Sequence, residues 1–164
     1  NLTNKMGYKT YASFWNQYLS KKIKKKYGYV DLIYSANTIS HIPNLDEVFK
    51  AIKIILNEEG IFVFEDPYIL SVLHNNSYDQ FYDEHAHVFS VISISKIIKK
   101  FKLKVFDIEK LETHGGSIRY YICHDKSNFK IKKTVKQFFF LGKFLMNTPS
   151  LLPISKVFFG LYLF

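Results

Sequence analysis

The chain has 164 residues, 48% of them hydrophobic, which suits one domain with a core of ordinary size. The net charge is +9, but the lysines are spread along the chain and Arg119 is the sole arginine, so we expect no nucleic-acid partner. Cys123 is the only cysteine, which excludes an internal disulfide and a zinc site built on several cysteines, and favours a reducing, cytoplasmic location.

An amphipathic helix is predicted near the start of the chain, over residues 10–26. Its apolar positions recur at helical spacing and are Tyr11, Phe14, Trp15, Tyr18, Leu19 and Ile23. Gly28 is expected to end this helix. The apolar run Val30–Ser35 then predicts a short buried strand.

A second helix and a second strand follow. Asn44 is placed to cap the helix, and Gly60 is expected to stop it. The apolar face of this helix consists of Val48, Ala51, Ile52, Ile55 and Leu56. Ile61–Phe64 predicts a buried strand that ends at Glu65. Strand, helix and strand at this spacing predict a βαβ unit with two adjacent parallel strands.

Residues 66–90 show little periodicity, and a long irregular segment inside a compact domain is usually functional. A short helix is expected from Ile94 to Phe101, followed by strands at Val105–Ile108 and Ile118–Ile122. The Gly115-Gly116 pair between these strands suits a tight turn that approaches its neighbours closely.

Residues 126–164 differ from the rest because they contain no Asp or Glu. Their apolar runs are shorter than the ~20 residues of a membrane span. We divide the chain at residue 125 and predict a basic, apolar tail beyond it. The alternatives for this tail are a truncated C-terminal domain, a helix in contact with a membrane surface, and sequence that is foreign to the domain.

The most informative motif is Phe81-Tyr82-Asp83-Glu84-His85, within the irregular segment. A phenol, two carboxylates and an imidazole stand in four successive positions there. A second histidine, His41, follows the first predicted strand. Histidine is the usual side chain for proton transfer near neutral pH, and neighbouring acids or phenols can orient it. A single Glu-His pair is more often a surface pair, but these groups together suit the removal of a proton from carbon.

The order of elements resembles the second half of a class I S-adenosylmethionine-dependent methyltransferase. That resemblance implies an α/β, Rossmann-like sheet, mostly parallel and ending in an antiparallel hairpin. More narrowly, the chain is similar to sugar C-methyltransferases that act on nucleotide-linked ketodeoxysugars. The similar stretches are Asn37 to Pro43, Phe64 to Tyr68, Tyr78 to His85 and Thr113 to Arg119.

Two parts of that family have no counterpart in this sequence. They are the zinc-bearing module with four cysteines and the first strand with its Gly-rich cofactor loop. We therefore expect residues 1–125 to be a partial methyltransferase domain, and the chain to be a fragment or the product of a truncated gene. The enzymatic activity of the family is expected for the parent enzyme and stays open for this chain.

The resemblance implies roles for four side chains in methylation at carbon. His85 is the candidate general base, and Tyr82 could donate to the oxygen of an enolate. Glu84 would bind a substrate hydroxyl or orient the imidazole, and His41 would bind substrate or shuttle a proton. Each has a structural alternative: a hydrogen-bonded loop histidine, a packed tyrosine, a surface carboxylate or a polar loop cap.

Asn37 and Ala36 are the candidate residues for the cofactor, at its methionyl end. The implied cofactor is S-adenosyl-L-methionine, the implied partner is a nucleotide-sugar substrate, and no metal site is expected. Two other functions stay open. An O- or N-methyltransferase would leave the run Tyr82–His85 unexplained, and an inactive remnant or membrane-associated module would use the basic tail instead.

Overall fold

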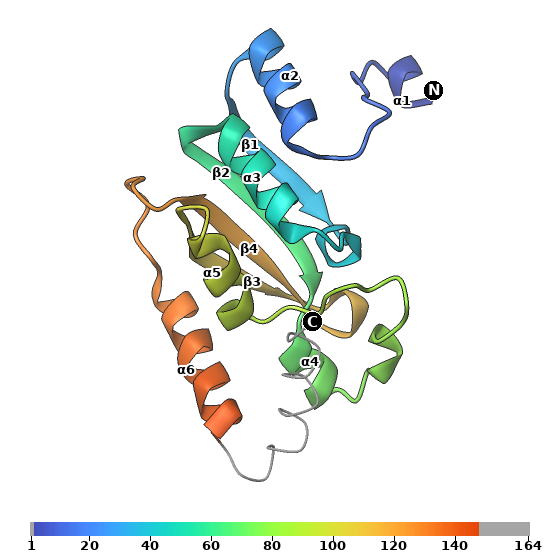
Figure 1. Ribbon diagram of the computed structural model, residues 1–164. Coiled ribbons are helices and arrows are strands. Elements are labelled where there is room, and N and C mark those ends of the chain that lie inside the picture. Colours follow the sequence, from blue (N-terminus) through green and yellow to red (C-terminus); the bar gives the residue numbers. More distant parts are fainter. Residues whose placement is uncertain (1, 148–164) are drawn as a thin grey trace.

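The fold is built on a four-stranded sheet in the order β1-β2-β4-β3 (Figure 1). The computed structural model describes residues 2–147, without the side chains of Tyr78, Leu145 and Met146. The strands are β1 (Val30–Ala36), β2 (Leu56–Pro67), β3 (Leu103–Leu111) and β4 (Ser117–His124). The helices are α1 (Leu2–Lys5), α2 (Gln17–Tyr27), α3 (Leu45–Ile55), α4 (Ile69–His74), α5 (Val91–Lys99) and α6 (Lys133–Asn147). Three short 3-10 turns are η1 (Ile39–His41), η2 (Tyr78–Gln80) and η3 (Thr113–Gly115).

The predicted βαβ unit is confirmed. Strands β1 and β2 are adjacent and parallel, with Ala36 paired to Glu65, and α3 connects them. Strand β4 runs antiparallel to β2 on one side and to β3 on the other. A parallel pair followed by an antiparallel hairpin is the arrangement expected for the second half of a class I methyltransferase sheet, so the predicted fold class is confirmed.

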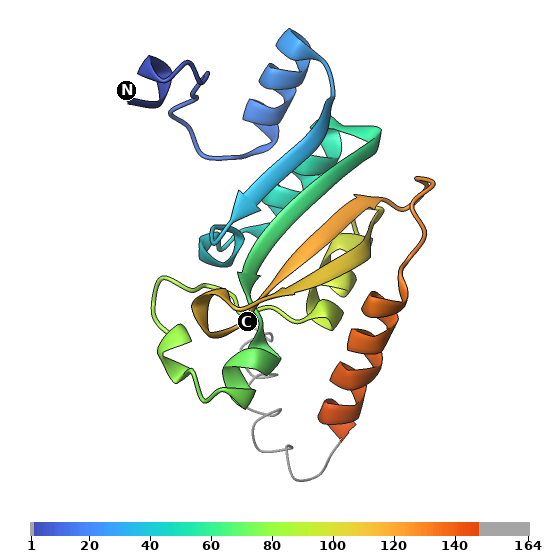
Figure 2. The same cartoon turned by 180° about the vertical axis from the view of Figure 1, so that it is seen from behind.

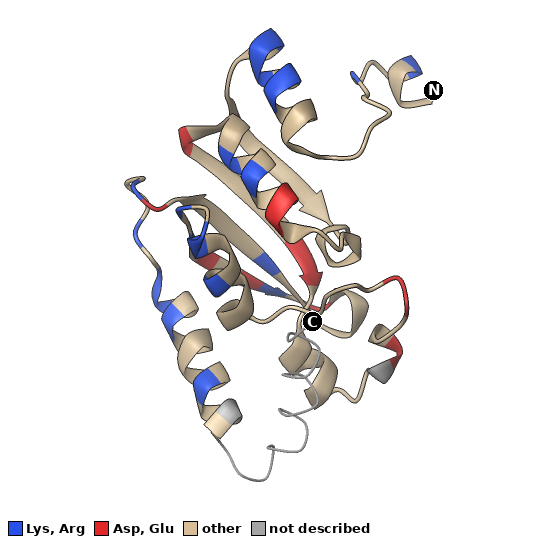
Figure 3. Cartoon of the chain, in the orientation of Figure 1, with Lys and Arg blue, Asp and Glu red and all other residues tan. Residues whose placement is uncertain are grey.

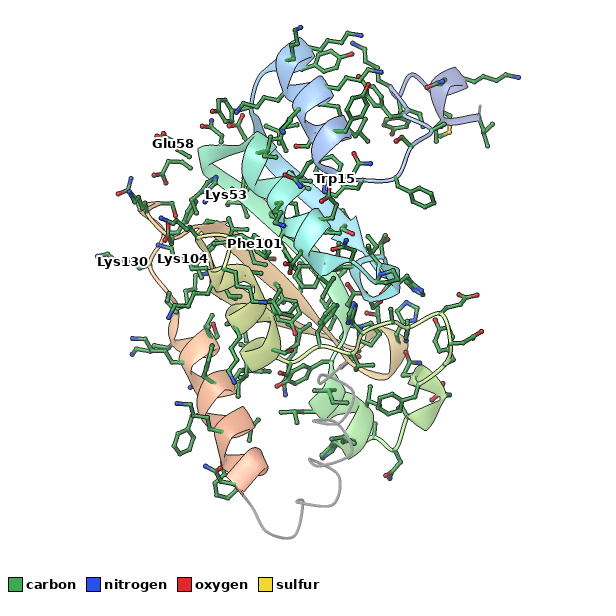
Figure 4. The ribbon with its side chains drawn as sticks, in the orientation of Figure 1. Trp15, Lys53, Glu58, Phe101, Lys104 and Lys130 are labelled. Carbon is green, nitrogen blue, oxygen red and sulfur yellow. The ribbon has the colours of Figure 1, made fainter. Side chains whose placement is uncertain are left out.

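The first helix is shorter than predicted. It begins at Gln17 instead of residue 10, because the side chain of Asn16 accepts a hydrogen bond from the Leu19 amide (2.8 Å) and caps the helix there. Trp15 lies just before the helix and packs against the core (Figure 4). Gly28 ends the helix as expected, with a left-handed φ of 85°.

The boundary between α3 and β2 also differs from the prediction. Asn44 caps α3 as expected, accepting from the Glu47 amide (3.1 Å), but the helix ends at Ile55 and not at Gly60. Leu56 already belongs to β2 because it pairs with Val30 on β1. Regular pairing resumes only at Ile61, so residues 57–60 form an irregularity inside the strand.

The segment predicted to be irregular contains the end of β2, the helix α4 and the turn η2. Val72 of α4 is fully buried. The turn between β3 and β4 packs closely against α4, as the glycine pair predicted. The Tyr68 amide donates to the Gly116 carbonyl (3.1 Å), and a Cβ on Gly116 would come within 2.5 Å of the Ser71 Cβ.

The helices α3 and α5 cover one face of the sheet, and the view from behind shows the opposite face in front of them (Figure 2). The core lies under these helices and is rich in aromatic rings. Phe64 and Tyr120, from neighbouring strands, stack with centroids 4.6 Å apart. On the other face, Leu32 and Tyr34 of β1 are 64% and 57% exposed.

The predicted tail contains α6, which packs against the core through Val135, Phe138 and Phe139. Residues 148–164, including the apolar run that begins at Val157, lie outside the described residues. Within residues 2–147, none of the helices combines the length and the apolar character that a membrane span requires. The division of the chain at residue 125 stays a prediction.

Candidate functional site

Two loops meet at the carboxyl edge of the parallel strands, where α/β folds place their ligands. The turn η1 follows β1 and carries His41, and the loop after η2 carries Tyr82, Glu84 and His85; the two lie side by side (Figures 1 and 2). One link between them is the hydrogen bond from His41 Nδ1 to the Glu84 carbonyl (2.9 Å). The fold thus brings the four predicted catalytic residues to one place.

His85 is held in a defined orientation by two hydrogen bonds. Its Nδ1 lies 2.7 Å from the Gln80 carbonyl, which can only accept, so Nδ1 carries a proton. The neutral ring then has its free electron pair on Nε2, which lies 3.1 Å from the Tyr82 hydroxyl. Tyr82 is the donor in this second bond. The arrangement therefore exposes the basic nitrogen of His85 toward the phenol.

His41, Tyr82 and His85 form a cluster of three rings, called here the histidine cluster. The centroids of His41 and His85 are 4.8 Å apart, and those of Tyr82 and His85 are 4.1 Å apart. His41 donates its Nδ1 proton to the Glu84 backbone, which leaves its Nε2 as an acceptor in the neutral ring. The Glu84 side chain is exposed and forms no hydrogen bond within the described part of the chain.

Ala36 and Asn37 lie at the end of β1, on the same edge of the sheet. Asn37 has a left-handed φ of 48°, which asparagine tolerates better than most residues, and its amide donates to the Glu65 carbonyl (2.8 Å). The Ala36 carbonyl accepts from the Thr38 hydroxyl (2.8 Å). The exposed Asn37 side chain is therefore available to a ligand, whereas Ala36 offers only its backbone and methyl group.

Asp66 is a residue of this site that the sequence interpretation missed. It lies near the end of β2, is 0% exposed, and accepts from the Ser40 hydroxyl (2.6 Å). Burial raises the pKa of Asp66, while the Ser40 hydrogen bonds and the charges of His41 and His85 act in the opposite direction. The sequence position of Asp66 could have indicated it, because Asp66 directly follows a predicted buried strand and α/β folds bind ligands at the carboxyl ends of parallel strands.

Charge is distributed unevenly over the molecule. Acidic positions lie at the end of β2 and in the loop after α4, but also on α3 and near the start of β2, and basic positions lie on the strands as well as on the helices (Figure 3). At the end of β2, Glu65 is paired with Arg119, whereas Asp66 has no ion pair within the described residues. Asp79, Asp83 and Glu84 are the acidic residues of the loop after α4. Across residues 2–147, no three His, Cys, Asp or Glu side chains are grouped to hold a metal ion.

Comparison with known protein families identifies the family of this chain. A family model described as a methyltransferase domain matches residues 9–108. The chain belongs to this methyltransferase family. The class I, S-adenosylmethionine-dependent assignment predicted from the sequence is thereby confirmed.

One curated relative is C-methyltransferase NovU from Streptomyces niveus, which is 26% identical over 136 residues. The match covers 83% of this chain but only 32% of the relative. A solved S-adenosylmethionine-dependent methyltransferase from Anabaena variabilis covers 67% of this chain and 55% of its own, with a TM-score of 0.49 and 14% identity. The match to the PH0226 protein from Pyrococcus horikoshii covers 75% of this chain and 63% of that protein, with a TM-score of 0.47 and 13% identity. The fold assignment rests on the family match and the sheet topology.

Proposed function

We propose that this methyltransferase acts at carbon, on a nucleotide-linked ketodeoxysugar, and that the histidine cluster performs the proton transfer. The orientation of His85 carries this proposal, because its basic nitrogen is presented at the ligand edge with the tautomer already fixed. The similarity to C-methyltransferase NovU supports methylation at carbon. Since the chain spans 32% of that relative, both substrate and activity are proposals for this chain.

The first step is the removal of a proton from carbon. A C–H group beside a ketone is weakly acidic, so a base must take the proton while the electron pair moves toward the ketone oxygen. His85 Nε2 accepts that proton. His85 Nδ1 keeps its proton and continues to donate it to the Gln80 carbonyl, so the imidazolium forms without a change in ring orientation.

The developing enolate needs a hydrogen-bond donor at its oxygen. The substrate carbon would take the place of the Tyr82 hydroxyl at Nε2, which frees the phenol to donate to the enolate oxygen. The exposed Glu84 carboxylate accepts from a sugar hydroxyl. His41 faces the same space and can bind the substrate through Nε2.

S-adenosylmethionine, when bound, supplies the methyl group and takes the electron pair of the C–S bond that breaks. The residues present fit one end of this cofactor. Asn37 presents an exposed amide at the end of β1, and the nearby carboxylates favour a sulfonium. An enzyme that methylates oxygen or nitrogen often needs no carbon base, so the histidine cluster favours methylation at carbon.

The test is solvent-deuterium exchange at the carbon beside the ketone, which needs the base but no methyl donor. The probe is a nucleoside-diphosphate-linked 4-keto-6-deoxyhexose, followed by proton NMR in deuterium oxide. We expect exchange with the wild-type chain and a loss of about 10²–10⁴ in rate with His85→Ala. His74→Ala is the matched control, because His74 is exposed and bonds only to neighbouring Asn75.

Two results would count against the proposal. Exchange at the wild-type rate in His85→Ala would remove His85 from the role of base and make His41 the leading candidate. The absence of exchange with the wild-type chain, under conditions in which the folded protein binds the probe, would contradict the proposed chemistry itself.

A further inference from the structure

Asp66 has no task in the mechanism described so far. Its Oδ1 accepts from the Ser40 hydroxyl, but its Oδ2 is buried and accepts no hydrogen bond from any residue that the structure describes. A buried carboxylate is costly unless its charge is compensated, and each such unsatisfied atom calls for an explanation. A neutral side chain could hold Ser40 at lower cost. The carboxylate therefore points to a need for negative charge at this position.

Asp66 is connected to both loops of the site through one residue. Ser40 donates its hydroxyl to Asp66, and its amide lies 3.4 Å from the same oxygen. The Ser40 carbonyl in turn accepts from the His87 amide (3.0 Å), in the loop that carries His85. Ser40 also precedes His41 directly. One carboxylate under the sheet edge thus fixes the positions of both histidine-bearing loops.

Asp66 reaches the histidine cluster through Ser40, which precedes His41, and the His41 ring lies 4.8 Å from that of His85. Positive charge on either imidazole lowers the pKa of Asp66. Its chain neighbour Glu65 lies on the opposite face of the strand, where it pairs with Arg119 through an Nε–Oε2 distance of 2.8 Å. On that face Glu65 shares Arg119 with Glu109 and accepts from the Tyr34 hydroxyl, so Arg119 is engaged away from Asp66. A positive charge for Asp66 can therefore come from the histidine cluster when one of its imidazoles is protonated.

We propose that Asp66 is the counter-charge of the imidazolium that His85 forms on accepting the carbon proton, and the anchor that holds both loops through Ser40. It is a positioning residue, because it acts through the histidines and not on the substrate. This role rests on the proposed function for its use in catalysis. The electrostatic coupling and the anchoring can each be measured without substrate.

The coupling is reciprocal, so it can be read from the carboxyl group. If an imidazolium is stabilised by Asp66, the same imidazolium favours the Asp66 carboxylate. Carbon-13 NMR of the labelled aspartates gives the pKa of Asp66 in the full chain. We expect His85→Gln and His41→Gln each to raise the pKa of Asp66 by about 0.5 or more. His74→Gln is the control and should leave it unchanged.

The anchoring is tested by amide hydrogen exchange of His87. Asp66→Leu and Ser40→Ala should each accelerate that exchange about tenfold or more, because the support of Ser40 is lost. Asp66→Asn should retain the protection, since its amide oxygen still accepts from Ser40. With the loops in place but the charge gone, Asp66→Asn should slow carbon–deuterium exchange about tenfold.

The outcomes separate the two proposals. An unchanged Asp66 titration in both histidine variants overturns the counter-charge role, and unchanged His87 protection in folded Ser40→Ala overturns the anchor, even if Asp66→Leu does not fold. Wild-type carbon–deuterium exchange that persists at full rate in Asp66→Asn also overturns the counter-charge role. A wild-type chain without any carbon exchange contradicts the proposed function, while the carboxyl titration still decides the coupling.

Discussion

Backbone carbonyl groups orient both histidines of the site. Gln80 accepts from His85 Nδ1, and Glu84 accepts from His41 Nδ1 through its backbone. A backbone carbonyl does not gain or lose a proton near neutral pH, so the tautomers of the two histidines do not depend on the ionisation of a neighbouring acid. In the neutral form, each ring therefore has Nε2 as its unprotonated nitrogen.

The Tyr82 hydroxyl should matter for proton transfer although its side chain is 43% exposed. Tyr82→Phe keeps the ring beside His85 but removes the donor for the enolate oxygen. We expect carbon–deuterium exchange to fall about tenfold to a hundredfold, less than for a buried oxyanion donor. Tyr29→Phe, at an exposed tyrosine stacked under Lys24 and away from the site, is the control. Equal rates for wild type and Tyr82→Phe would exclude the phenol as a donor.

The buried Asp66 carboxyl should make stability depend on pH. Its ordinary pKa is 3.8, and burial raises the pKa of Asp66 in the folded protein. Between these two values the folded state binds more protons than the unfolded state, so the free energy of unfolding falls as pH rises through this window. Asp66→Asn removes that proton uptake. The free energy of unfolding of Asp66→Asn minus that of wild type should therefore be larger at about pH 7 than at about pH 3.5.

Urea unfolding at both pH values measures this difference. Asp107→Asn, which removes a carboxylate paired with Lys132 on β3, is the control for the loss of one acidic side chain. The same stability difference between Asp66→Asn and wild type at both pH values would contradict the expected contribution.

The sequence predicted the residues of the candidate site where they are contiguous or follow a strand. Tyr82, Glu84 and His85 stand in one run, and His41 follows β1, so the parallel sheet brings them together. The role of Asp66 depends on its contact with Ser40, which is 26 positions away in sequence. Periodicity carries no information about such a contact, because it arises only when the two loops pack on the strand ends.

At the scale of elements, the turn η3 depends on Gly116. A Cβ at this position would lie 2.5 Å from Ser71 Cβ on α4, in a backbone conformation with φ 111°. Gly28 also has positive φ, but nothing lies within 4 Å of its Cβ position. Gly116→Ala should therefore lower the free energy of unfolding by about 1–3 kcal/mol more than Gly28→Ala does.

Thermal or urea unfolding of the two variants gives this difference. The double variant Gly116→Ala, Ser71→Gly removes the clashing atom and should recover part of the loss. If the two alanine variants lose equal stability, the close packing between η3 and α4 makes no contribution, and backbone strain alone explains the cost.

The sequence predicted the type and order of β1, α3, β2, α5, β3 and β4 because their apolar runs are strongly periodic. Several boundaries differ from the prediction, most of all the starts of α2 and β2. Trp15 is apolar at helical spacing, but the Asn16 cap starts α2 after it. Leu56 fits the apolar face of a helix and also a buried strand, and its pairing with Val30 across the sheet decides between them. Long-range pairing cannot be read from a local pattern.

The two faces of the sheet differ at the scale of the whole molecule. The helices α3 and α5 cover one face, and β1 exposes Leu32 and Tyr34 on the other (Figure 2). The candidate site lies at the carboxyl edge between these faces, beside the acidic positions at the end of β2 and in the loop after α4 (Figure 3). Under the proposed function, the described part of the chain supplies one wall of the ligand site, and this wall carries the proton-transfer groups.

This distribution leads to a prediction about the cofactor. S-adenosylmethionine is held in class I folds mainly by a Gly-rich turn after the first strand, and the seven glycines of this sequence include no Gly-x-Gly. Under the proposed function, Asn37 at the end of β1 contacts only the methionyl end of the cofactor. We therefore expect the 164-residue chain alone to bind S-adenosylmethionine weakly, with no saturation in calorimetry at micromolar concentrations. Tight binding that is lost in Asn37→Ala would show that the edge of β1 is sufficient for the cofactor, contrary to this expectation.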